Sequence, residues 1–205
     1  PFVRKGWLAQ KLNMLVILGS LGMNIALLVE LLITNENFVY TMGHFPAPFG
    51  NELRGGPLEA LLASCFCLVM ALCNLGGVDT LYKDIRPQKQ YLYFLMTNLL
   101  LCSMISMIYT NDLFTGYVFI EINTIAACAI VMVKESGETT VATIRYLIMS
   151  LLGSGLFLFG MAMLYGITGH LLMEDLQESI LALAATGKYA VPLTVTIGMM
   201  ALSTA

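Results

Sequence analysis

The sequence predicts an all-α protein, a polytopic bundle of about six transmembrane helices. Hydrophobic residues fill 58% of the 205 positions and charged residues only 11%, whereas soluble domains carry about 25% charged residues. The mean hydropathy is +0.81. The apolar residues also gather into runs long enough to cross a bilayer, with short polar stretches between them. We therefore expect an integral, multi-pass membrane protein.

Six apolar runs predict the helices, and no soluble domain, linker or low-complexity tract separates them. The first five are long enough to span a hydrocarbon core of ~30 Å, but the sixth supplies only about 24 Å at 1.5 Å per residue. We expect a single transmembrane domain over 1–205, truncated at both ends, since the chain opens on Pro1 without a signal-peptide pattern. The predicted helices cover 12–33, 57–78, 91–108, 112–133, 141–167 and 190–205.

The basic residues predict the orientation of the bundle. Eight of the ten lysines and arginines fall before the first run, between the second and third, or around the turn between the fourth and fifth. Only Arg54 and Lys188 fall on the opposite side. Because cytoplasmic loops carry the excess of basic residues, the first side is predicted to be cytoplasmic and the run at 112–133 to pass inward from the outer face.

Two longer loops lie on the predicted outer side. The loop at 34–56 is rich in glycine, proline and aromatic residues, which is typical of an irregular cap at the membrane interface. It contains His44, and the loop at 168–189 contains His170. Each histidine is interpreted either as a solvated interface residue or as a group through which protons enter.

One acidic residue, Glu121, lies deep inside an otherwise apolar run. It falls about nine residues into 112–133, roughly 13 Å deep and close to the middle of the bilayer. An acidic residue at a helix centre costs on the order of 2.5–3.5 kcal/mol, so it usually faces a partner, a cavity or an ion path. We interpret Glu121 as an ion-translocation residue. The alternative is a protonated acid that only bonds a neighbouring helix.

Several polar side chains in the apolar runs are candidates to line a hydrated path. They could equally join helices by hydrogen bonds, which average only about 0.6 kcal/mol in measured membrane proteins. Small residues in 141–167, such as Gly153 and Ser154, allow close approach of a neighbouring helix, so we expect this run in the bundle interior. The candidate path residues are Asn98, Ser106, Asn123 and Thr124.

The chain carries no arrangement typical of covalent catalysis. No glycine-rich phosphate loop follows a strand, no nucleophile lies beside a plausible base, and no residues have the spacing of metal ligands. The five cysteines fall in apolar runs and are expected to pack as small hydrophobic residues. The net charge of −3 offers no basic patch for nucleic acid. We expect no cofactor, no metal and no nucleic acid, and whether the chain serves a larger enzyme stays open.

Two segments give the sequence a resemblance to a known family. NDLFTGYVFIEI at 111–122 and TTVATIRYLIMSLLGSGLFLFGMAMLYGITG at 139–169 are similar to antiporter-like proton-translocating subunits. Respiratory complex I, the Mrp cation/proton antiporters and membrane-bound hydrogenases share these subunits. FPAPFG at 45–50 and PLEALLA at 57–63 resemble the same family more loosely. The resemblance spans nearly the whole chain and rests on the order and spacing of the motifs together.

The resemblance implies an antiporter-like fold built from inverted repeats, of which this chain covers roughly the second to seventh helices. The pattern of basic residues agrees with that assignment. The functional glutamate of the family falls on Glu121. Its lysine partner on the seventh helix would follow Ala205, because GMMALSTA resembles the approach to that lysine. Arg145 stands where many relatives have lysine, a change that keeps the charge.

The resemblance also implies a function, the movement of protons or the exchange of sodium for protons within a multisubunit membrane complex. Expected partners are other membrane subunits, the lipid bilayer, protons and sodium ions, and the expected location is a prokaryotic inner membrane. Ions would pass through Glu121 and the lysine expected after the fragment. The alternative is a scaffold or assembly subunit in which Glu121 only holds helices together. The sequence decides neither the transported ion nor the driving reaction.

Overall fold

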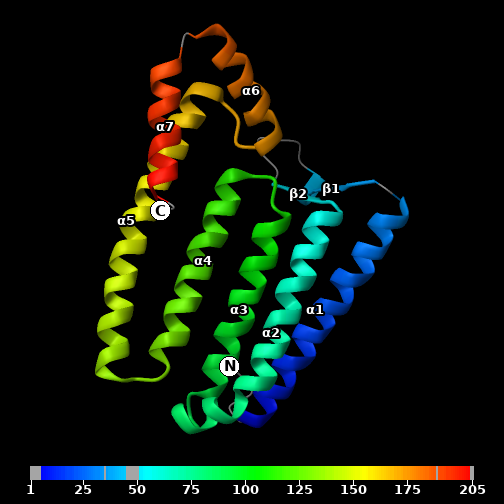
Figure 1. Cartoon of the computed structure of the whole chain (residues 1–205), viewed down its shortest axis with the longest axis vertical. Helices are drawn as coiled ribbons and strands as arrows, with labels where there is room; N and C mark the ends of the chain where they lie inside the picture. The colour runs from blue at the N-terminus through cyan, green and yellow to red at the C-terminus, as the bar shows by residue number, and fades with distance from the viewer. Residues whose placement is uncertain (1–5, 35, 45–50, 188, 204–205) are drawn as a thin grey trace.

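The computed structural model describes residues 6–34, 36–44, 51–187 and 189–203, which form a helical membrane bundle (Figure 1). Its five long helices are apolar and long enough to cross a membrane. The all-α transmembrane prediction is therefore confirmed. These helices are α1 (Gly6–Thr34), α2 (Pro57–Asp84), α3 (Gln90–Tyr109), α4 (Leu113–Met132) and α5 (Gly137–Thr168).

The long helices begin and end close to the predicted runs, with the largest differences at two ends. The first helix begins at Gly6 rather than at residue 12, and the second continues to Asp84 rather than ending at residue 78. The reason is that hydropathy marks only the part of a helix that lies in hydrocarbon. Backbone hydrogen bonding continues into the polar region, where a helix can carry charged residues such as Lys83.

The two outer loops are more ordered than the sequence indicated. The loop at 34–56 contains an antiparallel hairpin of β1 (Phe38–Thr41) and β2 (Glu52–Gly55), with a short 3-10 helix, η1 (Met42–His44), after β1. The FPAPFG motif at 45–50 lies outside the described residues. The loop at 168–189 contains α6 (Met173–Thr186), which was not predicted because its apolar residues are too few to form a membrane run.

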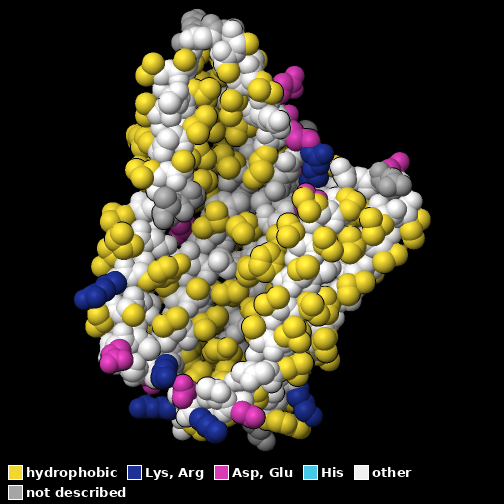
Figure 2. Space-filling model, viewed as in Figure 1, with side chains coloured by type: hydrophobic (Ala, Val, Ile, Leu, Met, Phe, Trp, Pro, Cys, Tyr) yellow, Lys and Arg dark blue, Asp and Glu magenta, His cyan; other side chains and the backbone are white. Residues whose placement is uncertain are grey.

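The five long helices lie side by side in sequence order, α1 packs against both α2 and α3 to form a triplet, and α7 packs against α5 (Figure 1). Figure 2 shows hydrophobic side chains over the flanks of the bundle, whereas most visible charged side chains lie at the end that carries the α2–α3 and α4–α5 turns. Large apolar side chains on the flanks are exposed, as in Leu15 at 67% and Leu152 at 67%. This distribution suits a surface that faces lipid.

Helix α5 lies at the edge of the described bundle rather than in its interior as expected (Figure 1). One face packs against α4 and against the last helix, α7 (Ala190–Ser203). The other face is open, with Ile148 55%, Leu151 70% and Leu152 67% exposed. Small residues of α5, such as Gly153 and Gly160, therefore allow close packing on only one face of the helix among the described residues.

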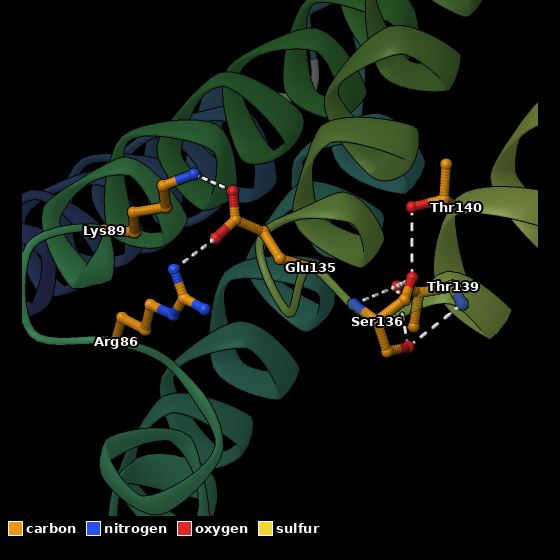
Figure 3. A network of polar contacts seen from close by, with 6 residues as sticks. All are labelled: Arg86, Lys89, Glu135, Ser136, Thr139 and Thr140. Carbon is orange, nitrogen blue, oxygen red and sulfur yellow. Dashed lines mark hydrogen bonds and ion pairs between the residues drawn. The ribbon is translucent and has the colours of Figure 1, made fainter.

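Ion pairs tie the α2–α3 turn to the α4–α5 turn (Figure 3). The carboxylate of Glu135 pairs with Lys89 and lies 3.5 Å from Nη1 of Arg86. Beside it, Lys134 donates to Asp84 at 2.9 Å. Ser136 then caps α5 by accepting from the backbone N–H of Thr139 at 3.1 Å. The hydrogen bond from Lys89 and its charge lower the pKa of Glu135.

We expect Glu135→Gln to lower the melting temperature near neutral pH and to have no effect in acid. A carboxyl whose pKa is lower in the folded than in the unfolded state adds stability above its unfolded pKa. That stability is lost as the pH falls through the folded pKa, where the wild type is neutral like the variant. The effect is small because the pair is exposed. Thermal unfolding in lipid nanodiscs over a pH series measures it, with the exposed Glu36→Gln as control. A difference that does not depend on pH would contradict the prediction.

At the end of the bundle predicted to face outward, Asn111 joins the hairpin to the start of α6. Its side-chain Nδ2 donates to Oε1 of Glu52 at 2.7 Å, and its backbone N–H donates to the Glu52 carbonyl at 3.0 Å. Its own carbonyl accepts from the N–H of Met173 at 2.9 Å. An ion pair between Arg54 and Glu174 lies alongside. These contacts hold the turn before α4 against the β1–β2 hairpin and the start of α6.

We expect Asn111→Ala to lower the free energy of unfolding by about 1–3 kcal/mol, because Asn111 is only 7% exposed and its loss removes a buried donor to Glu52. The exposed Asn37→Ala, which lies just before the same hairpin, is the control. Thermal or denaturant unfolding compares the two variants. Equal stability of both would show that the side-chain bond adds nothing to the backbone contacts.

Candidate functional site

Glu121 lies in the middle of α4, a helix that begins on a strong cap. Asp112 accepts a hydrogen bond from the backbone N–H of Phe114 at 2.9 Å, which starts the helix at Leu113. Glu121 follows eight residues later, about 12 Å along the axis at 1.5 Å per residue. The helix continues for eleven more residues to Met132. The carboxylate is therefore far from both ends of a membrane-spanning helix.

The Glu121 side chain lines a cavity of about 340 Å³ between α4, α5 and the last turn of α7. Its Oε1 atom is buried and has no hydrogen-bond partner among the described residues. Burying an unpaired polar atom is unfavourable, so this arrangement calls for a partner. The other lining residues are Tyr117, Ile120, Thr124, Tyr146, Met149, Ser150, Gly153, Ser154, Phe157 and Ser203.

Aromatic and hydroxyl side chains form the walls of this cavity. The rings of Tyr117 and Phe157 stack with centroids 6.0 Å apart and an interplanar angle of 10°, and Tyr117 lies one turn before Glu121 on α4. The Thr124 hydroxyl donates to the carbonyl of Ile120 at 3.0 Å, within its own helix. The cavity is therefore partly polar, and the described residues that line it include no lysine, arginine or histidine.

Close packing against α5 brings α7 to the cavity. At Gly160 an added Cβ would lie 2.7 Å from Cγ of Met200 and 3.4 Å from the Thr196 carbonyl oxygen. At Gly153 it would lie 3.0 Å from the carbonyl oxygen of Ser203. Glycine at both positions thus allows the two helices to touch, and Thr196 in this contact is fully buried.

Of the four predicted path residues, the structure brings only Thr124 to the Glu121 cavity. Asn123 points toward α3, where its Oδ1 accepts from the Ser103 hydroxyl at 3.3 Å. Asn98 and Ser106 lie on α3, and neither is among the residues that line the cavity. Whether these three residues line an ion path stays a prediction. They lie on α3 or face it, and so belong to a different helix interface from the Glu121 cavity.

Three further residues, Tyr117, Tyr146 and Ser150, line the cavity but were not predicted from the sequence as part of a site. Tyr117 could have been predicted, because it lies four residues before Glu121 and residues four apart lie on the same face of a helix. Ser150 was interpreted only as a packing residue. Its position opposite Glu121 depends on how α5 is rotated against α4, which spacing within one helix does not determine.

Of the two histidines, only the side chain of His170 is described, and it is not among the described residues that line this cavity. Nδ1 of His170 lies 3.9 Å from Oδ2 of Asp175, and both side chains are half-exposed. The side chain of His44 lies outside the described residues. Within the described ranges no group of three or more histidine, cysteine or acidic residues could hold a metal ion. The arrangement can hold a proton on Glu121 or pair its carboxylate with a cation that enters the cavity.

Residues 110–205 match the family described as NADH:quinone oxidoreductase/Mrp antiporter, transmembrane. The chain is 31% identical over 161 residues to the N subunit of NADH-quinone oxidoreductase from Desulforudis audaxviator, covering 78% of this chain and 31% of the relative. It is 25% identical over 186 residues to a Na(+)/H(+) antiporter subunit of Alkalihalophilus pseudofirmus, covering 91% of this chain and 37% of the relative. The chain thus spans about a third of the length of these relatives.

Solved structures show the same fold in subunits of multisubunit membrane complexes. The chain matches an archaeal membrane-bound sulfane sulfur reductase with a TM-score of 0.78 and 26% identity, over 95% of this chain and 38% of the other. It matches the Mrp complex of Dietzia sp. with a TM-score of 0.80 and 19% identity, over 98% and 36%. It matches respiratory complex I of Thermus thermophilus with a TM-score of 0.66 and 18% identity, over 98% of this chain and 39% of the other. The last two likenesses concern the fold alone.

Proposed function

We propose that this chain, which belongs to the family of antiporter-like membrane subunits, forms part of a subunit that translocates protons or exchanges sodium for protons. Its relatives are parts of respiratory and antiporter complexes, so the proposed partners are other membrane subunits of such an assembly. The proposed setting is the lipid bilayer of a prokaryotic inner membrane, which is supported by the bacterial origin of these relatives.

The observation that carries this proposal is the unpartnered Oε1 of Glu121 inside the α4–α5–α7 cavity, among the residues that the structure describes. A nearby positive charge favours ionisation of a carboxyl, and the effect weakens as the charge moves away. A cation that moves toward Glu121 would therefore release its proton, and a cation that moves away would let it be protonated. Glu121 would act as a switchable anion in the middle of the membrane.

The cation in this mechanism is a lysine expected after Ala205. Helix α7 reaches the cavity at Ser203, within the part of the chain that the structure describes. This lysine would pair alternately with Glu121 and with a later proton acceptor. The sequence that follows Ala205 tests this step directly. A uniformly apolar continuation would remove the proposed partner.

A scaffold role is the second candidate, and it makes a different prediction for Glu121. An acid that only joined helices would be expected to have a hydrogen-bond partner on a neighbouring helix, and among the described residues Oε1 has none. The deciding experiment measures proton and sodium movement per catalytic turnover by the full complex in proteoliposomes, with wild type and Glu121→Gln. Loss of movement supports translocation, and an unchanged ratio with lower stability supports the scaffold.

A further inference from the structure

Three asparagines with buried amide atoms lie in the α1–α2–α3 triplet, away from the α4–α5–α7 cavity. They are Asn13 on α1, Asn74 on α2 and Asn98 on α3, and we call them the asparagine layer. Polar groups in a membrane bundle need hydrogen-bond partners, because lipid supplies none. Their surroundings therefore show what each asparagine can bind.

Two apolar clusters place the asparagines at one level. The first cluster contains Ile17, Ala71 and Leu101, one from each helix of the triplet. The second contains Leu81 and Phe94, with Ala9 packed against it.

Each asparagine lies between the two clusters in sequence. Asn13 lies four residues from both Ala9 and Ile17, and Asn98 lies four residues after Phe94 and three before Leu101. Asn74 follows Ala71 by three residues and precedes Leu81 by seven. Spacings of three, four and seven put residues on the same face of a helix. The three side chains therefore occupy the shared interface between an apolar layer above and an apolar layer below.

Four amide atoms in this layer lack hydrogen-bond partners among the described residues. Asn13 is 1% exposed, and both its Nδ2 and its Oδ1 are buried without a hydrogen bond. Nδ2 of Asn74 and Oδ1 of Asn98 are also buried and unpaired, although Nδ2 of Asn98 donates to the Phe94 carbonyl at 3.1 Å. The layer thus presents two unused donors and two unused acceptors.

We infer that the asparagine layer binds internal water. A water molecule both accepts and donates hydrogen bonds, and buried waters typically make about three of them to groups that are otherwise unsatisfied. Donors and acceptors are both present here, whereas a sodium ion requires oxygen ligands alone. The site is independent of the Glu121 mechanism, because its residues lie on α1, α2 and α3 and none of them lines the Glu121 cavity.

The test is a cryo-EM map of the complete membrane complex, at a resolution that shows ordered water, in sodium and in potassium buffers. We expect density within hydrogen-bond distance of Asn13 and of Asn74 or Asn98, present in both buffers. Amides paired directly with one another and no density would overturn the inference. Density that appears only in sodium would also overturn it, in favour of a cation site.

Asn13→Leu removes a donor and an acceptor at similar side-chain volume, so the density should be lost. The matched control is Asn24→Leu on the same helix, because Asn24 already donates to the Ser20 carbonyl and accepts from the Tyr109 hydroxyl. Its substitution should leave the density in place. Density that persists in Asn13→Leu would contradict the assignment.

If Asn13→Leu does not assemble, hydroxyl-radical footprinting of the wild-type complex decides the question. Phe94 is 1% exposed and lies next to Asn98 on its helix face, so radicals reach it only from internal water. Modification of Phe94 supports a hydrated layer. Its complete protection would overturn the proposal.

Discussion

Replacing Glu121 by glutamine is expected to abolish coupled ion translocation while the complex still assembles. Glutamine has nearly the same volume, so the α4–α5–α7 cavity keeps its shape, but an amide cannot alternate between a neutral and a charged state. We expect the rate of coupled movement to fall at least about tenfold, equal to about 1.4 kcal/mol on the limiting step. Ion flux per turnover in proteoliposomes measures the change.

The control is Glu138→Gln, in the first turn of α5 on the opposite side of the membrane from the hairpin. This control also replaces one glutamate by glutamine, but Glu138 does not line the Glu121 cavity. Normal coupling by both variants would rule out Glu121 as the switchable group. Lower stability of the Glu121 variant with normal coupling would instead support the scaffold role.

Replacing Gly160 by leucine is expected to displace α7 from α5. A Cβ at this position would lie 2.7 Å from Met200 and 3.4 Å from the backbone oxygen of Thr196, so even the first added carbon has no room. Overpacking of this kind costs typically about 1–3 kcal/mol. Because Ser203 of α7 lines the Glu121 cavity, the displacement should also reduce translocation.

Gly155→Leu is the matched control, since an added Cβ on that face of α5 meets nothing within 4 Å. Thermal stability of the complex in nanodiscs, together with the α5–α7 distance from paired spin labels, distinguishes the two variants. An unchanged distance in Gly160→Leu would show that the contact between these helices is adaptable. Equal losses in both variants would point to the helix itself rather than to its packing.

Much of the architecture was predictable because each membrane helix must satisfy its own backbone in lipid. The run at 112–133 became α4 with a difference of one residue at each end, and the depth of Glu121 followed from counting residues. The structure of the two loops that contain the β1–β2 hairpin and α6 was not predictable in the same way. The β1–β2 hairpin and α6 lie in the two outer loops, where the pattern of hydropathy carries little information about local structure.

The sequence by itself determined the class of the protein, the approximate course of its spans and the presence of an acid at mid-membrane, because hydropathy and helical rise act along one dimension. Only the tertiary structure decided which side chains share a space with that acid. Asn123 is two residues from Glu121 yet bonds Ser103, whereas Ser150, far along the chain, lines the same cavity as Glu121. The physical reason is that neighbours across an interface depend on the rotation and crossing of whole helices, which packing at positions such as Gly153 and Gly160 determines.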